Sequence, residues 1–310
     1  MKVREIKEEG VIFLRAMVKS SVVKHTSRTG SPYLEVLLVD NTGDIILRVW
    51  DISDDDVNNL EVGKVYDFHD VKAQIFKGRI TLSMNCLKCD PVLDYDVTDY
   101  SLTVIPDEDQ MTWNLVAHVN KIQDKDIKEM CKALMDVDEF KSKFYTHPAA
   151  EHNHHAEAHG LLFHTTRMMD VADKLCDVYK DVDRDIVIAS ILFHDVGKLQ
   201  ELEMNAAGAG SYTRMAMLGH IYIGASMVED FYKKGMISME QYLMITHCIL
   251  SHHGKKEWGS PVEPMTQEAL IVHMVDNLDA QVNKMENQFL HMEDGEFSGR
   301  VYKHPDGSAV

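Results

Sequence analysis

A histidine and an aspartate, His194 and Asp195, stand side by side at the end of an apolar stretch that begins at Ile186. A stretch that is apolar at almost every position indicates a buried helix, so both side chains are expected to enter one cavity where that helix ends. An imidazole nitrogen beside a carboxylate oxygen suits a divalent ion of the Mn, Fe, Co, Ni or Zn type. Lys198 follows Asp195 by three residues and would bring an ammonium group towards whatever the metal holds.

One His-Asp pair is a weak signal, but further residues of the same chemical types recur along the chain. In chain order these are His164, His220, His252, His253 and Asp276. Each lies at the end of, or inside, a segment in which apolar residues recur at three- and four-residue spacing, the pattern of a helix. The sequence therefore predicts a metal centre assembled from several helices.

Two more histidines are expected near this centre without binding the metal. His273 lies three residues before Asp276 on the same predicted helix face, where it could orient a ligand. His155 lies in a polar stretch upstream and could line the site. Each could equally be an ordinary core or loop residue. Asp279, one turn beyond Asp276, is expected to be a surface or supporting carboxylate and not a ligand.

The first ninety residues have the pattern of a small all-β barrel. Apolar residues alternate, and turns rich in Gly and Asn follow about every ten residues. The expected strands cover residues 13–22, 33–39, 45–50, 64–71 and 80–84. The run YLEVLLVDNTGDIILRVWD resembles part of an OB-fold, a barrel that commonly binds single-stranded nucleic acid or mediates oligomerisation.

The chain is thus expected to be multidomain, with an all-β OB-fold barrel followed by an all-α bundle. We place the barrel at residues 1–90, an acidic linker with two prolines at 91–110, the helical domain at 111–290 and a tail at 291–310. The clearest helical patterns cover residues 160–179, 184–194, 220–233, 238–253 and 266–287.

Charge is divided unevenly between these parts. Residues 1–92 carry 13 Lys and Arg against 14 Asp and Glu, whereas residues 93–310 carry 19 against 36. This acidic excess disfavours tight electrostatic wrapping of a duplex. Five scattered cysteines form no disulfide framework, and no apolar run approaches membrane-spanning length. We therefore expect a cytoplasmic protein without a membrane partner.

Five segments together resemble the HD-domain metal-dependent phosphohydrolases. They read HHAEAHGLLFHTTRMMDVAD, ASILFHDVGKLQEL, LGHIYIGA, SHHG and EALIVHMVDNLDA. With the OB-like front and the total length, they are most similar to the YhaM-type 3′-to-5′ exoribonucleases of Gram-positive bacteria. One position departs from that pattern, since His159 stands where the family usually has a glycine. Its imidazole could approach the cavity, although a polar loop formed with His152 and His154 is the favoured interpretation.

The resemblance implies the roles of the site residues. One metal would be held by His164, His194, Asp195 and Asp276, and a second by His220, His252 and His253, with Asp195 bridging the two. Asp195 and Lys198 would be the catalytic residues, with Lys198 on the scissile phosphate. The cofactor would be two divalent ions, with Mn²⁺ favoured over Fe, Co, Ni or Zn.

The activity implied is hydrolysis of single-stranded RNA from its 3′ end by a metal-activated water, which releases nucleoside 5′-monophosphates. Single-stranded DNA is a second candidate substrate, and a homo-oligomer is expected. The barrel would hold the strand through stacking by Tyr33, Trp50 and Phe76, helped by Arg28. The three rings could instead belong to the barrel core.

Other functions fit the same ligand set. A hydrolase of small nucleotides or a cyclic-nucleotide phosphodiesterase would need the helical domain alone. A nucleic-acid-binding protein with a relic, inactive HD domain is a further alternative, which the intact set of ligands disfavours. A di-iron oxygenase would use the same ligands but would gain nothing from Lys198. The barrel at the front favours the polymer substrate.

Overall fold

The structure of the protein is a computed structural model with two compact units. It describes residues 1–26, 29–53, 56, 60–76, 79–95, 99–100, 108–150, 158–204, 210–289, 292, 295, 297–298 and 301–304. The barrel unit comprises Met1–Val104 and Met204–Ala209, and the helical unit comprises Ile105–Glu203 and Gly210–Val310.

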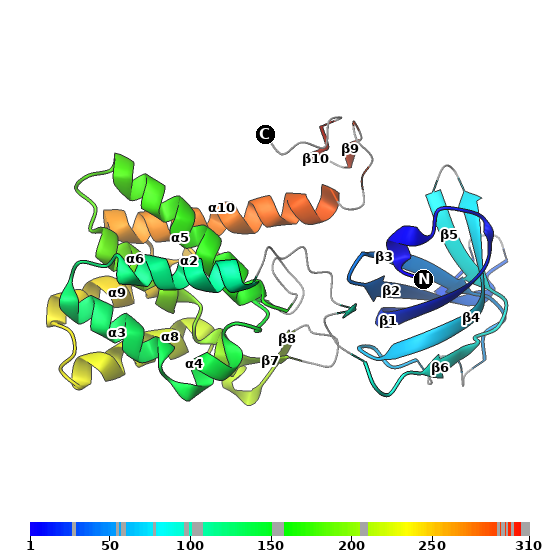
Figure 1. The fold of residues 1–310 in the computed structure, drawn as a ribbon, viewed down its shortest axis with the longest axis horizontal. Coiled ribbons are helices and arrows are strands. Elements are labelled where there is room, and N and C mark those ends of the chain that lie inside the picture. The colour runs from blue at the N-terminus through cyan, green and yellow to red at the C-terminus, as the bar shows by residue number, and fades with distance from the viewer. Residues whose placement is uncertain are drawn as a thin grey trace. The chain divides into compact units, whose positions relative to one another are not determined.

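A closed five-stranded barrel forms the first unit (Figure 1). The strands are β1 (Gly10–His25), β2 (Pro32–Asp40), β3 (Gly43–Val49), β4 (Val65–Phe76) and β5 (Arg79–Met84), with a short β6 (Cys89–Pro91) beside β4 and a 3-10 helix η1 (Val3–Glu5) before β1. Their order is β1-β2-β3-β5-β4, and β1 pairs with β4 to close the ring. Only β3 and β5 run parallel in this sheet. This order is that of an OB-fold, so the predicted β barrel is confirmed.

The long strand β1 can pair on both sides because its register shifts twice, between Ile12 and Leu14 and between Val18 and Ser20. Such bulges bend a strand and help a sheet to close. Inside the barrel, the alternate residues Leu34, Val36 and Leu38 of β2 are fully buried. The apolar alternation seen in the sequence is therefore the inward face of the barrel.

The residues that follow the barrel pack against it. Tyr100 is buried in a small cluster with Met17, Val39 and Val65, and Val92 and Tyr95 lie against that cluster. Val92 also donates a backbone hydrogen bond to the Val65 carbonyl. The described part of the segment that we expected to be a linker, residues 91–95 and 99–100, thus belongs to the barrel unit.

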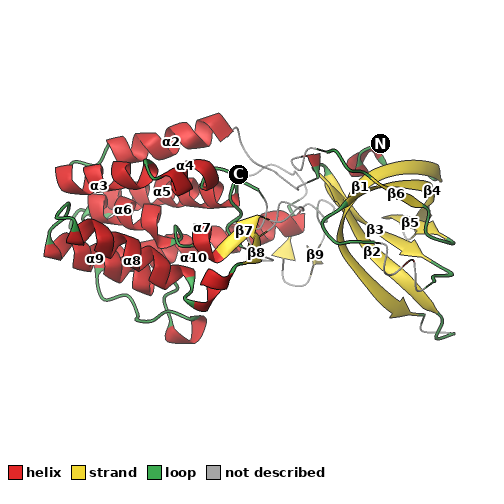
Figure 2. Cartoon of the chain, turned by 90° about the horizontal axis from the view of Figure 1, so that it is seen from below, coloured by secondary structure: helices red, strands yellow, loops and turns green. Residues whose placement is uncertain are grey.

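Helices build the second unit (Figures 1 and 2). They are α2 (Glu108–Asn120), α3 (Lys125–Met135), α4 (Asp138–Lys143), α5 (Gly160–Val178), α6 (Arg184–His194), α7 (Lys198–Glu201), α8 (His220–Lys233), α9 (Met239–Ser251) and α10 (Gln267–Phe289), with 3-10 turns η3 (Arg214–Met217) and η4 (Lys256–Trp258). Short strand pairs are added, β7 (Leu202–Met204) with β8 (Gly210–Tyr212) and β9 (Phe297–Ser298) with β10 (Val301–Tyr302). The all-α prediction is therefore only approximately right, because strands this short leave no alternating pattern in the sequence.

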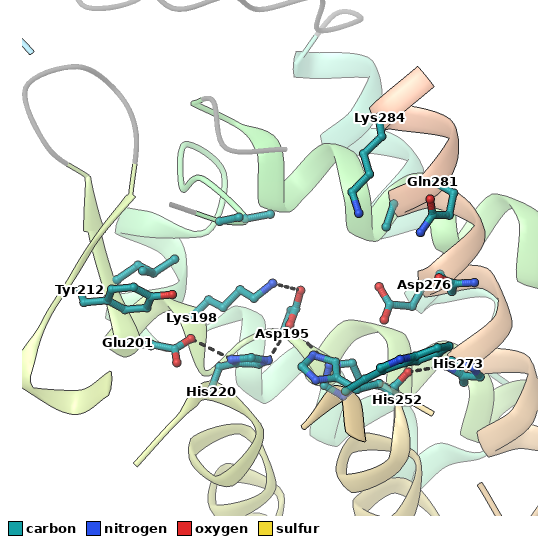
Figure 3. Close-up of a pocket in the computed structure, with 17 residues that line it drawn as sticks. Asp195, Lys198, Glu201, Tyr212, His220, His252, His273, Asp276, Gln281 and Lys284 are labelled. Carbon is teal, nitrogen blue, oxygen red and sulfur yellow. Dashed lines mark hydrogen bonds and ion pairs between the residues drawn. The ribbon is translucent and has the colours of Figure 1, made fainter. Parts of the chain in front are cut away.

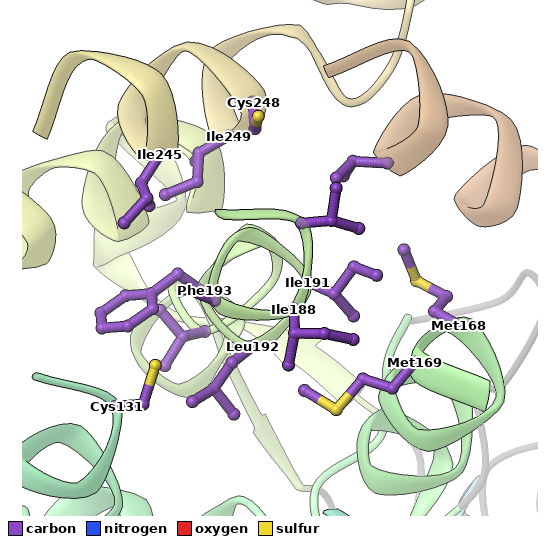
Figure 4. Close-up of a cluster of buried hydrophobic side chains, with 14 of the residues drawn as sticks. Cys131, Met168, Met169, Ile188, Ile191, Leu192, Phe193, Ile245, Cys248 and Ile249 are labelled. Carbon is purple, nitrogen blue, oxygen red and sulfur yellow. The ribbon is translucent and has the colours of Figure 1, made fainter. Parts of the chain in front are cut away.

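Helix α6 forms the centre of the helical core, with α5, α8, α9 and α10 packed around it. Figure 4 shows it end-on, with Ile188, Ile191, Leu192 and Phe193 pointing to different neighbours. A helix that is apolar all round must be buried, and every residue from Ile186 to His194 is buried. At 11 residues α6 is short, and no helix in the described part of the chain is both long and apolar enough to cross a membrane.

Candidate metal centre

Asp195 lies at the middle of a group of imidazoles, immediately after the last residue of α6 (Figure 3). Its Oδ2 is 3.3 Å from His194 Nε2 and 4.0 Å from His164 Nε2. Its Oδ1 is 3.6 Å from His220 Nε2 and 3.8 Å from His252 Nε2. The two oxygens of one buried carboxylate therefore face two different sets of imidazoles.

Helix ends bring these side chains together. His194 is the last residue of α6, His220 is the first residue of α8, and His252 follows the last residue of α9. His164 and Asp276 project from inside α5 and α10, and His164 Nε2 is 3.2 Å from Asp276 Oδ1. Five elements thus contribute to one site, which matches the prediction that several helices assemble it.

Each of the four imidazoles around Asp195 donates a hydrogen bond from its Nδ1, which fixes the orientation of the ring. The acceptors are Asp279 Oδ2 for His164 (2.7 Å), the Ile191 carbonyl for His194 (2.7 Å), Glu201 Oε2 for His220 (2.8 Å) and the Ile249 carbonyl for His252 (2.6 Å). When Nδ1 carries the proton, the lone pair of Nε2 is left for a metal ion. Outer hydrogen bonds of this kind are typical of histidines that bind metals.

Two groups of possible ligand atoms result, each within 4.8 Å: His164, His194 and Asp195, and His220, His252 and His253. Several of these atoms, His194 Nε2, Asp195 Oδ1, His220 Nε2 and His253 Nδ1, are buried without a hydrogen-bond partner among the described residues. Leaving such atoms unsatisfied costs free energy, whereas a divalent ion would satisfy them. The residues present therefore fit the metal ions that the ligand types imply.

The pKa shifts of the site residues also fit a metal centre. Burial opposes the charge of Asp195, but Lys198 and His194 outweigh it and hold the pKa of that carboxyl well below its usual range. Lys198 Nζ lies 2.6 Å from Asp195 Oδ2. Burial also disfavours charge on His164, yet hydrogen bonds to Asp276 and Asp279 raise its pKa to about 9. Burial and His194 hold the pKa of His252 well below its usual range, so Asp195 stays charged and His252 stays neutral, the forms in which each binds a cation.

Two glycines allow the elements to approach so closely. A Cβ on Gly197 would overlap the His220 carbonyl, so only glycine lets α8 begin at this place. Gly254 has a positive φ of 83°, and a Cβ there would overlap the imidazole of His273. His273 Nδ1 donates to the His252 carbonyl at 2.8 Å. His273 therefore holds the loop that carries His252. Its imidazole packs directly against Gly254, where a larger residue would not fit.

A cavity of about 540 Å³ opens over the proposed ligands. Asp195, Lys198, His220, His252, His253 and Asp276 line it. Its wall continues along α10 through Asn277, Gln281 and Lys284, and Tyr212 and Trp258 add aromatic surface. A cavity of this size takes a ligand as large as a nucleotide.

Comparison with known proteins agrees with this geometry. The HD domain family model matches residues 161–281, the stretch that carries all seven proposed ligands. The 3′-5′ exoribonuclease YhaM of Listeria innocua is 32% identical over 301 residues, which cover 96% of this chain and 93% of that protein. The YhaM of Bacillus subtilis is 32% identical over 294 residues, which cover 92% and 90%.

The chain belongs to the YhaM family of 3′-5′ exoribonucleases. The family resemblance seen in the sequence motifs is thus confirmed. Among solved structures, the OB domain of a Methanosarcina mazei protein is 21% identical and covers 31% of this chain and 86% of that one, with a TM-score of 0.25. The strand order of the barrel, and not this weak likeness, identifies the OB-fold.

In this YhaM-family chain, the structure brings together the seven proposed ligands, Lys198 and His273. His155 lies outside the described residues. Asp279 is buried and accepts from His164, so it supports a ligand from behind. Arg167 Nε in turn lies 2.8 Å from Asp279 Oδ1.

His159 takes no part in lining the cavity. It precedes α5 with a positive φ of 65°, and its Nδ1 donates to the Tyr145 carbonyl at 2.8 Å. A left-handed backbone favours glycine, which is the residue that the family resemblance implied at this position. The imidazole is therefore held by Tyr145 and does not line the cavity.

Four residues of this site were missed in the sequence. Glu201 follows Lys198 by one helical turn, which is the only signal that it faces the same cavity. Lys284 lies two turns beyond Asp276, a spacing that equally fits a solvated surface. Tyr212 and Trp258 lie in a hairpin and a 3-10 turn, where no periodicity reveals the direction of a side chain.

The aromatic residues predicted to bind a strand lie outside the barrel core. The rings of Tyr33 and Trp50 contact each other at a tilt, with 4.8 Å between centroids, at the ends of neighbouring strands β2 and β3. Phe76 ends β4 and is 64% exposed. Arg28 lies outside the described residues. The structure thus brings Tyr33 and Trp50 together and leaves all three rings open to solvent in part.

Proposed function

We propose that this protein is a metal-dependent 3′-to-5′ exoribonuclease that shortens single-stranded RNA and releases nucleoside 5′-monophosphates. The observation that carries the proposal is the position of Asp195 between two sets of imidazoles, at the base of a cavity large enough for a nucleotide. Its relatives from Listeria and Bacillus carry the name of this activity.

The proposed ligands divide between two divalent ions, with Mn²⁺ favoured. One set is His164, His194, Asp195 and Asp276, and the other is His220, His252 and His253, with Asp195 facing both. Bound there, such ions would lower the pKa of a water molecule and neutralise charge on a phosphate. Imidazole and carboxylate ligands equally admit Fe, Co, Ni or Zn.

The protein's own side chains then position the reactants. Asp195 orients the attacking water, since its carboxylate lies at the centre of the site. Lys198 lies beside it and donates a hydrogen bond to a non-bridging oxygen of the scissile phosphate, where charge develops during attack. Glu201 and Asp279 keep the imidazoles of His220 and His164 in the orientation that binding requires.

The barrel unit is proposed to hold the strand on the 5′ side of the cut. Tyr33, Trp50 and Phe76 offer ring surface to bases, and Arg28 is proposed to contact phosphates. Base stacking on aromatic rings tolerates any sequence, which suits an exonuclease. The proposed division of labour assigns strand binding to residues 1–90 and hydrolysis to residues 111–290, with a tail at 291–310. Residues 91–110 would connect the two, and their described part packs on the barrel.

We further propose a cytoplasmic homo-oligomer. All five cysteines are free, as expected in a reducing compartment. Size-exclusion chromatography with light scattering would measure the number of chains, and a monomer would contradict this part of the proposal.

A 5′-labelled single-stranded RNA tests the activity. Protein stripped with EDTA and then supplied with Mn²⁺, Co²⁺, Ni²⁺, Zn²⁺ or Fe²⁺ should produce a ladder that shortens stepwise from the 3′ end. Asp195→Asn should produce none, whereas Lys174→Gln, an exposed lysine on α5 away from the cavity, should match the wild type. Absence of any ladder with every metal would contradict the proposal. A labelled DNA strand beside the RNA measures preference.

A nucleotide hydrolase is the second candidate, because the cavity also suits a single small nucleotide. Nucleoside triphosphates and cyclic nucleotides should be turned over poorly compared with RNA. If they were hydrolysed while the labelled strand stayed intact, the substrate would be a small nucleotide and the barrel would need another role.

A further inference from the structure

Two lysines line the cavity, and they differ in what they contact. Lys198 Nζ is held by Asp195 at 2.6 Å. Lys284 is exposed and forms no ion pair with any residue in the described part of the chain. All the donors of its ammonium group are therefore available to a ligand, whereas Lys198 also donates to Asp195.

The geometry of α10 directs Lys284 towards the site. Asp276, Ala280 and Lys284 follow at four-residue spacing and so share one face of the helix. Lys284 lies about 12 Å along the axis from Asp276, at a rise of about 1.5 Å per residue. Side chains on a helix lean towards its N-terminus, and the small side chain of Ala280 leaves the space between them open.

The close-up of the cavity agrees with this direction. Lys284 and Gln281 point from α10 into the space above Asp276, whereas Tyr212 lies on the other side of Lys198 (Figure 3). All five residues line the same cavity. An ammonium group and an amide thus face the route by which a strand would reach the proposed ligands.

We infer that Lys284 binds the phosphate next to the scissile one, on the 5′ side, with Gln281 beside it. The inference rests on the proposed function. A strand cut at its last linkage carries no phosphate beyond the scissile one towards its 3′ end. A second phosphate in the cavity must therefore belong to the preceding nucleotide. Lys284 would make this protein prefer chains over the shortest substrate.

The two shortest suitable substrates differ only in that phosphate. The dinucleotide UpU holds one phosphate, and pUpU holds a second on the 5′ side of the scissile linkage. Wild-type protein should hydrolyse pUpU with a kcat/KM about tenfold higher, the effect expected of one charged hydrogen bond. In Lys284→Gln the ratio should fall close to one, chiefly through KM. Lys284→Arg should restore most of it.

Lys174→Gln is the matched control, since Lys174 is an exposed helical lysine that does not line the cavity. It should keep the wild-type ratio. On a longer RNA, Lys284→Gln should also lower the slope of log KM against log salt by about one, whereas the control should not.

An unchanged ratio and an unchanged salt slope in Lys284→Gln would overturn the inference and leave the proposed function standing. Equal losses on UpU and pUpU would also overturn it, because they would indicate a general disturbance of the site. If wild-type protein cut neither dinucleotide nor a longer strand, the proposed function would fail and the inference with it.

Discussion

The two units of this protein differ in how far their proposed functional side chains are exposed to solvent. In the helical unit, His194, Asp195 and His252 are at most 3% exposed, and each is fixed by neighbours. In the barrel unit, the core is closed and apolar, and the rings offered for binding lie outside it. Buried side chains that their neighbours hold in place can keep the fixed geometry that catalysis needs. Exposed rings can stack on the bases of any sequence. Substitution of the buried ligands should therefore lower kcat and metal affinity, whereas substitution of the barrel rings should raise KM.

The largest effect is expected for Asp195→Asn. The amide keeps the shape but removes the negative charge that both sets of imidazoles face, so turnover should fall at least about a thousandfold. Metal affinity should fall as well, as measured by calorimetry. Binding of single-stranded RNA in EDTA, measured by fluorescence anisotropy, should stay within about twofold, because the barrel is untouched. Normal turnover in this variant would contradict the division between units.

Glu201→Gln should have the next largest effect. The amide oxygen can still accept from His220 Nδ1, but the negative charge that makes this imidazole a stronger ligand is lost, and metal affinity should fall about 10- to 100-fold. Glu203→Gln is the matched control, because Glu203 is exposed and does not line the cavity. Equal metal binding in the two variants would show that the charge of Glu201 is unimportant to the site.

Gly254→Ala separates backbone strain from displacement of His273. Both Gly254 and Gly235 have positive φ, but a Cβ on Gly235 would meet nothing within 4 Å. Each alanine should cost about 1–2 kcal/mol in the free energy of unfolding from its backbone alone. Gly254→Ala should cost about 1–3 kcal/mol more and weaken metal binding, because His273 must move. Equal unfolding midpoints in urea would argue against the role given to His273.

Trp50→Ala tests the barrel. Loss of one stacking ring should raise KM for RNA about tenfold, with kcat nearly unchanged. Phe13→Ala, another partly exposed ring of the barrel, should leave KM as it is. A fall in kcat without a rise in KM would place Trp50 outside strand binding.

The smallest effect is expected when the pH is lowered, and it concerns the free energy of unfolding. Burial lowers the pKa of His147 to about 4, although its Nε2 donates to the Lys198 carbonyl at 3.0 Å. The pKa of this histidine is lower in the folded than in the unfolded chain, where it is about 6.5. Its contribution to the free energy of unfolding is therefore complete above pH 6.5 and is lost as the pH falls towards 4. Urea unfolding in EDTA should show about 1–2 kcal/mol lost between pH 7 and 5. His147→Gln should lose less over that interval, and an equal loss would exclude His147 as the cause.

Much of the framework could be predicted from the sequence. Helices α6 and α8 begin and end at the predicted residues, because α6 is apolar at almost every position and the apolar residues of α8 recur at helical spacing. The histidines at helix ends stood out because rare residues recurred at equivalent places. Glu201 and Lys284 could not be found in the same way, since charged residues on a helix are usually solvated. Only the packing of α7 and α10 shows which of their charges face the cavity.

Counting metal ions tests the central claim most directly. Stripped protein titrated with Mn²⁺ in a calorimeter should bind two ions per chain. His252→Ala should bind one, because the set that contains His164 and His194 remains intact, and Asp195→Asn should bind both ions weakly. A wild-type stoichiometry of one, or a stoichiometry and affinity unaltered by Asp195→Asn, would contradict the account of one carboxylate serving two sets of ligands.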